Sequence, residues 1–430
     1  MEFAFLKQLF SAFMAIIMAL PQVFTALGGT NPETHVRRDG KAPTVFVGGL
    51  TSYGEQSGIW YIFPLFGIRQ NVPKKLEDYG YECYVSSTGT LNSSWDRCCN
   101  LYAELTGTRA DYGEAHAKAH GHARYGRDYG KLLEDWGPDR PVNLIGHSGG
   151  GPVVNHFAHL LAEGCADERA ATADGSLSPL FAGGHANLVH SVTSLSGPVN
   201  GVSYGARFLF FRNDIFGHDA TILAGLELPG ITLFGNTLLF QQVRARDIPN
   251  YIMTRDHALY DLTPGGAAEI NMATAASADI YYFSYVTCDT TYNENTGRWR
   301  ISPHNLFTML AWPPYFPSFV GPVLFILGWL MSSRLYDGVR VYPSLDGDFQ
   351  IDGTWHRNDG FVNTNTSMYP FGAPHKDFDP QRIEKGTWQV FPVMEGHNHF
   401  YFAGFDYRHT GDELLDFFLG HLAMLDTTYE

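Results

Sequence analysis

Short apolar runs alternate along the chain with longer segments in which apolar residues recur every three or four positions. The apolar runs predict buried strands at 44–48, 82–86, 142–146, 189–195, 280–287 and 388–393. The periodic segments predict helices at 72–79, 95–105, 125–136, 152–163 and 412–425. Because strands that alternate with helices usually pair in parallel, we expect an α/β fold, with a mostly parallel sheet covered by helices on both faces.

The strand predicted at 142–146 leads into Gly146-His147-Ser148-Gly149-Gly150, which fits the pattern Gly-x-Ser-x-Gly. A strand, a tight turn and a helix can hold such a serine on a strained turn with its hydroxyl exposed. The pattern alone also occurs by chance in a glycine-rich chain, but the flanking strand and helix favour a nucleophilic Ser148.

A nucleophilic serine needs a basic histidine that is oriented by an acid, and in this class of fold the acid and then the histidine follow the serine. The downstream acid candidates are Asp346, Asp348, Asp352 and Asp359, and the base candidates are His397 and His399. The residues alone leave these alternatives open.

Backbone amides held in fixed positions can stabilise an oxyanion. The amide after the nucleophile belongs to Gly149, and the glycine-rich segment 47–54 after the first strand offers the amide of Leu50. We expect these two N–H groups to form the oxyanion hole, although an ordinary glycine-rich turn would have the same composition.

Residues 111–126 contain three histidines, His116, His120 and His122, among glycines and acidic residues. Imidazoles combined with carboxylates are typical zinc ligands. A histidine-rich loop that binds no metal fits this segment equally well.

Three further segments are unusually apolar. The apolar residues of 1–27 end at a proline and predict a signal peptide or an N-terminal hydrophobic anchor, followed by a polar linker at 28–43. We therefore expect the chain to enter the secretory pathway. Segments 202–240 and 313–335 are lid candidates. The apolar stretch of the second is short for a membrane span, which favours a lid or interfacial element over a span, with buried core as the alternative.

The net charge of the 430-residue chain is −15, from 29 basic and 44 acidic residues. This balance argues against nucleic acid as a partner, because phosphates favour a basic surface. The hydrophobic fraction of 44% is sufficient for a large core. We expect a single catalytic domain at 44–425.

Taken together, these motifs resemble the thermoalkalophilic, zinc-containing triacylglycerol lipases of bacilli and their staphylococcal relatives, which have the α/β-hydrolase fold. The segments that carry the resemblance are 95–126, 176–185, 191–193, 197–201, 358–364 and 398–404. The resemblance implies that Ser148 is the nucleophile, Asp359 the acid and His399 the base; His399 is preferred because Gly404 follows it at the family's spacing.

The resemblance also implies a structural zinc ion in a subdomain formed by 92–128 and 250–265. Its implied ligands are Asp96, His116, His122 and Asp261, the last in a Tyr-Asp-Leu sequence that the family shares. The family's calcium site has a glutamate where this chain has Tyr401, and only Asp406 remains as a ligand. We therefore expect zinc and no calcium.

The implied reaction is hydrolysis of the carboxylic esters of long-chain acylglycerols at a lipid–water interface, with contact to a membrane surface. A phospholipase, galactolipase or acyltransferase using the same residues is one alternative. A catalytically inactive lipid-binding protein and a hydrolase that uses zinc-bound water are two others. The sequence leaves the oligomeric state open.

Overall fold

The computed structural model describes most of the chain that follows the N-terminal segment. The described residues are 35, 41–50, 54–56, 71–89, 91–172, 175–207, 254–307, 320–341, 349–406, 408–409 and 411–429. The predicted signal or anchor segment 1–27 and most of the lid candidate 202–240 lie outside these residues.

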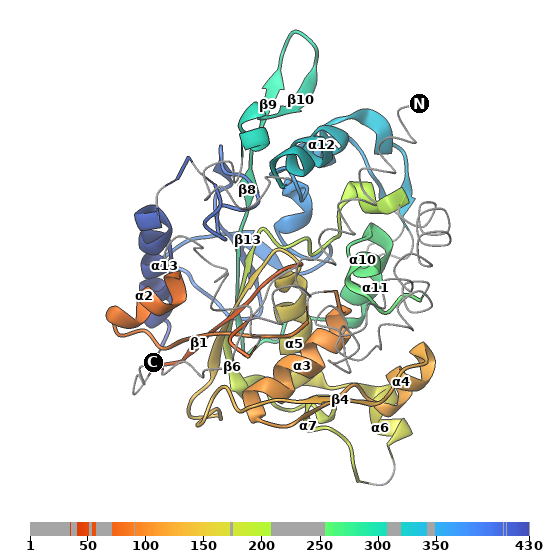
Figure 1. The fold of residues 1–430 in the computed structure, drawn as a ribbon, viewed down its shortest axis with the longest axis vertical. Coiled ribbons are helices and arrows are strands. Elements are labelled where there is room, and N and C mark those ends of the chain that lie inside the picture. Colours follow the sequence, from red (N-terminus) through yellow and green to blue (C-terminus); the bar gives the residue numbers. More distant parts are fainter. Residues whose placement is uncertain are drawn as a thin grey trace, which may run out of the picture.

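Seven strands form one parallel sheet in the order β13-β14-β7-β6-β5-β1-β2 (Figure 1). Their bounds are β1 Thr44–Val47, β2 Cys83–Val85, β5 Val142–His147, β6 Val189–Leu195, β7 Tyr281–Tyr285, β13 His375–Asp377 and β14 Trp388–Val390. All residues of β1, β2 and β5 are buried, which explains why these strands are apolar runs without alternation. The predicted α/β-hydrolase fold is confirmed, and the short, polar edge strand β13 is the one strand of this sheet that the pattern did not predict.

Helices cover both faces of this sheet (Figure 1). One face packs against α3 (Ser94–Thr106) and α5 (Gly150–Glu163) around residues such as Leu144 and Phe157. The other face packs against α2 (Val72–Asp78) and α13 (Gly411–Asp426) around Phe46 and Phe418. The other α-helices in the described part of the chain are α4 Glu114–His120, α6 Ala166–Ala171, α7 Pro179–Ala182, α10 Ala258–Asp261, α11 Pro264–Ala273 and α12 Val320–Ser332.

Smaller elements surround this core. Two-stranded pairs join β3 Arg109–Asp111 with β4 Tyr125–Asp128, β8 Thr287–Cys288 with β15 Met394–Glu395, β9 Thr290–Asn293 with β10 Arg298–Ile301, and β11 Arg340–Val341 with β12 Phe349–Gln350. Short 3-10 helices span Ala186–Leu188, Ser203–Arg207, Pro303–Phe307, Arg334–Tyr336, Gly353–His356 and Thr364–Ser367.

The helix predicted at 125–136 is wrong. Residues Tyr125–Asp128 form β4 instead, antiparallel to β3, and the residues up to 136 are irregular, with a turn at 134–135. Gly126 is needed in this strand, because a Cβ there would lie 2.5 Å from the hydroxyl oxygen of Tyr112. Pairing with β3 and the close approach of Tyr112 therefore override the helical periodicity.

None of the helices in the described part of the chain combines the length and the apolar character needed to cross a membrane. α12, within the lid candidate 313–335, has 13 residues.

Candidate active site

Ser148 lies at the sharp turn between β5 and α5. Its φ of 55° is left-handed, a conformation that residues other than glycine rarely adopt, and its N–H donates to Leu195 O at 2.9 Å. The flanking glycines permit the turn: a Cβ on Gly146 would lie 2.3 Å from Gly150 O, and a Cβ on Gly150 would lie 2.1 Å from Val47 O. The Gly-x-Ser-x-Gly motif thus forms a strained turn at the carboxyl end of β5.

Ser148, His399 and Asp359 form a chain of hydrogen bonds. Nε2 of His399 lies 2.8 Å from Ser148 Oγ, and its Nδ1 lies 2.9 Å from Asp359 Oδ2. The three residues are 6%, 1% and 1% exposed, respectively. The structure therefore brings together the three residues that the family resemblance selects, in the geometry of a nucleophile, a base and an orienting acid.

The other candidates for acid and base have different surroundings. Asp352 accepts a hydrogen bond from Thr354 N at the start of a 3-10 helix. His397 donates from Nδ1 to Glu395 O and stacks on the ring of His409. Asp346 and Asp348 lie outside the described residues.

The loop after Asp359 fixes the orientation of this carboxylate. Oδ1 accepts hydrogen bonds from Phe361 N at 3.0 Å and Val362 N at 2.8 Å, while Oδ2 accepts one from Thr287 Oγ1 at 2.8 Å. These hydrogen bonds hold the carboxylate in place with Oδ2 directed at His399. The ring of Phe361 also stacks on the imidazole of His399, with centroids 5.1 Å apart.

His147 supports the backbone of the candidate base. Its Nε2–H donates to His399 O at 2.9 Å. Burial lowers the pKa of His147 to about 3, so the ring is neutral at physiological pH and adds no positive charge beside His399.

The predicted oxyanion donors lie next to Ser148. A Cβ on Gly49 would be 2.5 Å from Ser148 Cβ and 2.8 Å from its Oγ, so the segment before Leu50 passes directly over the serine. Leu50 N lies 3.8 Å from the position that a Cβ on Gly149 would take. Leu50 N and Gly149 therefore lie close together beside Ser148, and their N–H groups remain the predicted oxyanion donors.

Arg97 of α3 supports both donor segments and was missed from the sequence. Its Nη1–H donates to Gly149 O at 3.1 Å, Nη2–H donates to Gly48 O, and Nε–H donates to Thr88 Oγ1 at 3.2 Å. Burial lowers the pKa of Arg97 to about 10, which keeps it protonated at neutral pH. The one signal in the sequence was its place in the Ser-Trp-Asp-Arg stretch that carries the resemblance.

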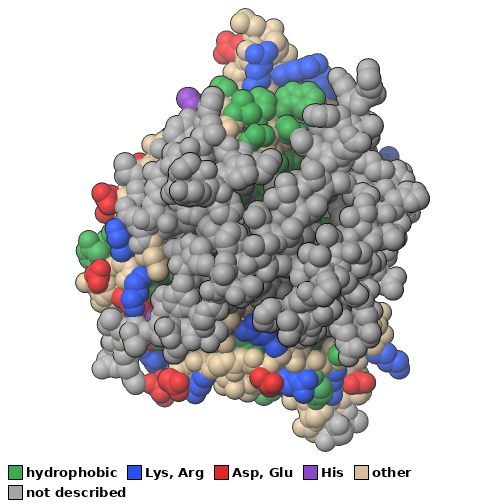
Figure 2. Space-filling view, in the orientation of Figure 1, with side chains coloured by type: hydrophobic (Ala, Val, Ile, Leu, Met, Phe, Trp, Pro, Cys, Tyr) green, Lys and Arg blue, Asp and Glu red, His purple; other side chains and the backbone are tan. Residues whose placement is uncertain are grey.

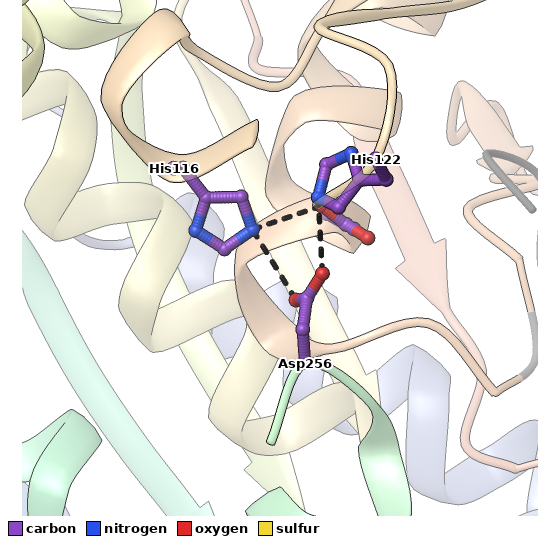
Figure 3. A group of neighbouring side chains, drawn as sticks. His116, His122 and Asp256 are labelled. Atoms are coloured by element: carbon purple, nitrogen blue, oxygen red, sulfur yellow. Dashed lines mark ion pairs between the residues drawn. The ribbon is translucent and has the colours of Figure 1, made fainter. Parts of the chain in front are cut away.

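Four ionisable residues meet beside this site. They are Asp96 of α3, His116 of α4, His122 just after α4 and Asp256 before α10, and one ligand atom of each lies within 4.8 Å of the others. His116 Nε2 is 3.2 Å from Asp256 Oδ1, and His122 Nε2 is 3.1 Å from Asp256 Oδ2 (Figure 3). His116 Nε2 is also 3.4 Å from Asp96 Oδ1. Two imidazoles and two carboxylates suit a tetrahedral metal site.

The two carboxylates of this group need a positive charge beside them. Burial lowers the pKa of His116, but the neighbouring carboxylates of Asp256 and Asp96 raise it to about 10, so a protonated imidazole supplies this charge when no metal ion is bound. A metal cation between the same atoms would satisfy both carboxylates and leave the imidazoles neutral.

Asp261, the predicted fourth ligand, is not part of this group, and Asp256 takes its place. The carboxylate of Asp261 instead accepts a hydrogen bond from Ser94 N at 2.6 Å, and burial raises its pKa to about 8. Asp256 precedes α10 and Asp261 is its last residue, so the two side chains have different neighbours. The Tyr-Asp-Leu match therefore selected an aspartate that lies outside this group.

Residues 40–312 and 346–428 match the family model described as lipase-like, C-terminal domain. The chain belongs to this lipase family. It is 30% identical over 369 residues to a lipase of Staphylococcus epidermidis, an alignment that covers 82% of this chain and 49% of the relative. It is 31% identical over 372 residues to Lipase 1 of Staphylococcus aureus, covering 83% of this chain and 50% of the relative. The chain thus spans about half the length of these relatives.

Two solved structures of similar size support this membership. Staphylococcus hyicus lipase superimposes with a TM-score of 0.71 at 29% identity, covering 93% of this chain and 99% of that one. EstA from Clostridium botulinum superimposes with a TM-score of 0.69 at 27% identity, covering 93% and 90%. The predicted family is therefore confirmed.

The residues at the calcium position of this lipase family do not fit calcium in this chain. Tyr401 offers a buried phenol where a carboxylate is needed. Both carboxylate oxygens of Asp406 accept hydrogen bonds from the guanidinium of Arg408, which also contacts Asp289. A cationic side chain thus already occupies the carboxylates that a metal ion would need.

Proposed function

We propose that this chain is a serine lipase that hydrolyses carboxylic esters of long-chain acylglycerols. The observation that carries the proposal is the hydrogen-bonded series Ser148, His399 and Asp359 beside two backbone amides. Membership of a lipase family supports the choice of lipid esters among the possible acyl substrates.

In the proposed mechanism, Ser148 Oγ attacks the acyl carbonyl carbon while His399 Nε2 takes the hydroxyl proton. Asp359 keeps Nδ1–H of His399 oriented and stabilises the imidazolium that forms. The N–H groups of Leu50 and Gly149 stabilise the oxyanion, a contribution of about 3 kcal/mol for a single donor. His399 then protonates the leaving glycerol oxygen, and a water molecule activated by the same imidazole releases the fatty acid and restores Ser148.

We assign a structural zinc ion to Asp96, His116, His122 and Asp256. A zinc ion held by these four side chains would cross-link their segments, and four protein ligands would leave no position for a reacting water. Asp96 directly precedes Arg97, which hydrogen-bonds to the segments that carry the two oxyanion donors. A metal ion bound to Asp96 would therefore stabilise α3, the helix that carries this arginine.

The choice of Asp256 over Asp261 gives a direct prediction. We expect Asp256→Asn to weaken zinc binding at least about 100-fold and to lower the melting temperature, because a ligating carboxylate is lost. Asp261→Asn is the matched control and should retain about one zinc per chain. Metal content after gel filtration and thermal unfolding measure both effects; zinc retained by Asp256→Asn but lost from Asp261→Asn would reverse the assignment.

We also propose that α12 contacts the lipid surface. It lies in 313–345, the stretch between the two family-matched parts, and Trp329 on it is 56% exposed. Figure 2 shows hydrophobic side chains gathered at this end of the molecule beside Lys and Arg side chains. On its inner side α12 accepts hydrogen bonds from Asn358 Nδ2 at Gly328 O and Ser332 Oγ, directly before Asp359.

Trp329→Ala should weaken binding to phospholipid-coated triolein emulsions about tenfold, since roughly 1.4 kcal/mol of apolar contact with the interface is removed. Turnover of a soluble short-chain ester should stay within about twofold. Tyr79→Ala removes a similarly exposed aromatic, 59% exposed, next to α2 and serves as the control. Equal binding by the two variants in a flotation assay would argue against the assignment of α12.

The apolar segment 1–27 supports the proposal that the chain enters the secretory pathway, with this segment as a signal peptide or an anchor. We therefore expect its substrates to be extracellular lipids or lipids of internal membranes.

The substrate class is tested by offering the purified protein emulsified triolein, a phospholipid and a galactolipid, with and without an alcohol acceptor. We expect fatty acid release to be fastest from triolein. Preferential release from a polar lipid, or transfer to the alcohol, would assign the same site to a phospholipase, galactolipase or acyltransferase. No turnover by folded, zinc-loaded protein would favour a lipid-binding role.

A further inference from the structure

Arg408 makes ion pairs with two buried carboxylates. Its Nη1–H and Nη2–H donate to Asp289 Oδ1 and Oδ2 at 2.9 and 3.0 Å, and its Nε–H and Nη2–H donate to Asp406 Oδ1 and Oδ2 at 3.0 and 2.8 Å. The side chains of Asp289 and Asp406 are 3% and 1% exposed. This is a planar, bidentate contact that a lysine ammonium cannot reproduce.

Each of these two aspartates is hydrogen-bonded to the residue that directly precedes a member of the proposed triad. Asp406 Oδ2 accepts a hydrogen bond from the N–H of Asn398, which directly precedes His399, at 3.2 Å. Asp289 N–H donates to the carbonyl of Asn358, which directly precedes Asp359, at 2.9 Å. Arg408 therefore connects the loop of the base with the loop of the acid.

The arginine also balances the charge of this buried pair. Burial would raise the pKa of Asp406, but the hydrogen bonds from Arg408 lower it below the ordinary value. For Asp289 burial outweighs the hydrogen bonds from Arg408, and its pKa is raised. Without the guanidinium, two carboxylates would lie close together in a buried place, which is unfavourable.

We propose that Arg408 is an internal cation that fixes the loop carrying Asp359 relative to the loop carrying His399, so that this chain positions its triad without a divalent metal ion. Arg408 is a positioning residue: it reaches His399 through Asp406 and Asn398, and Asp359 through Asp289 and Asn358. The inference rests on the proposed serine hydrolase function, because it assigns a role to the two loops that carry His399 and Asp359.

The test compares wild type, Arg408→Ala and Arg408→Lys with a soluble ester, in calcium-free buffer containing micromolar zinc. For Arg408→Ala we expect kcat to fall about 100-fold with KM within about twofold, because misplacement of the base by about 1 Å has this effect on the chemical step. Arg408→Lys should recover only part of the loss. Added Ca²⁺ or methylguanidinium, which can fill the space between the carboxylates, should restore at least about a tenth of wild-type kcat to Arg408→Ala and leave wild type unchanged.

Arg140→Ala is the matched control, because Arg140 pairs with the buried Glu82 beside the opposite ends of the strands. It should lose thermal stability but keep kcat, with no response to either cation. If Arg408→Ala does not fold, Asp289→Asn replaces it: this variant keeps the Arg408–Asp406 pair and should lose about tenfold in kcat.

A folded Arg408→Ala with kcat within threefold of wild type, or a wild type that calcium activates, would overturn the inference. Wild type that is itself inactive on every ester would instead contradict the proposed function, so the two failures are distinguishable.

Discussion

Alanine in place of Ser148 should lower kcat for long-chain acylglycerols by about a million-fold and leave the fold intact. The expected loss is this large because, in the proposed mechanism, Ser148 Oγ is the nucleophile and lies 2.8 Å from His399 Nε2, and no acyl-enzyme can form without it. Ser191→Ala is the control: this serine is also buried in the sheet, but its hydroxyl donates to Asn143. A fatty acid release assay and circular dichroism measure the two effects.

Residual turnover of Ser148→Ala within about tenfold of wild type would contradict the nucleophilic role. If that turnover then vanished on zinc removal, a hydrolase using metal-bound water would be the better account.

Gly49→Ala should lower kcat/KM at least about 100-fold. A Cβ at this position would lie 2.5 Å from Ser148 Cβ and 2.8 Å from Oγ, so either the serine or the segment carrying Leu50 N–H has to move. Loss of one oxyanion donor costs about 100- to 1,000-fold, and displacement of the nucleophile adds to it.

The control for Gly49→Ala is Gly137→Ala, because a Cβ on Gly137 meets nothing within 4 Å. Kinetics on a soluble ester with both variants separates the steric effect from a general effect of alanine. Activity of Gly49→Ala close to that of Gly137→Ala would show that the segment before Leu50 does not form part of the reactive site.

Most of the parallel sheet could be predicted from the sequence because most of its strands are buried and appear as largely apolar runs, whereas the polar edge strand β13 could not. The tight turn at the Gly-x-Ser-x-Gly motif could likewise be predicted, since the close approach of strand and helix requires glycines at these positions. The strand β4 could not, because its residues carry a helical period and only the pairing with β3 decides the outcome.

The candidate nucleophile could be selected from the sequence because its motif offers a single residue, Ser148, for this chemical role. His397 and His399 have nearly the same sequence surroundings, and only the resemblance, and then the hydrogen bonds in the structure, separate them. The same limit explains the choice of Asp261 over Asp256: a local three-residue match says nothing about which end of a helix faces the histidines. Arg97 and Arg408 act on backbone carbonyls or carboxylates that are distant in sequence, so no local pattern reveals them.

In the proposed mechanism Ser148 is a nucleophile activated by His399. This role is tested by treating the folded, zinc-loaded protein with a long-chain alkyl phosphonate and locating the adduct by peptide mass spectrometry. We expect one adduct per chain, on the peptide containing Ser148, and none in Ser148→Ala or when His399 is replaced by alanine. An adduct on another residue, or no adduct in wild-type protein that hydrolyses triolein, would contradict it.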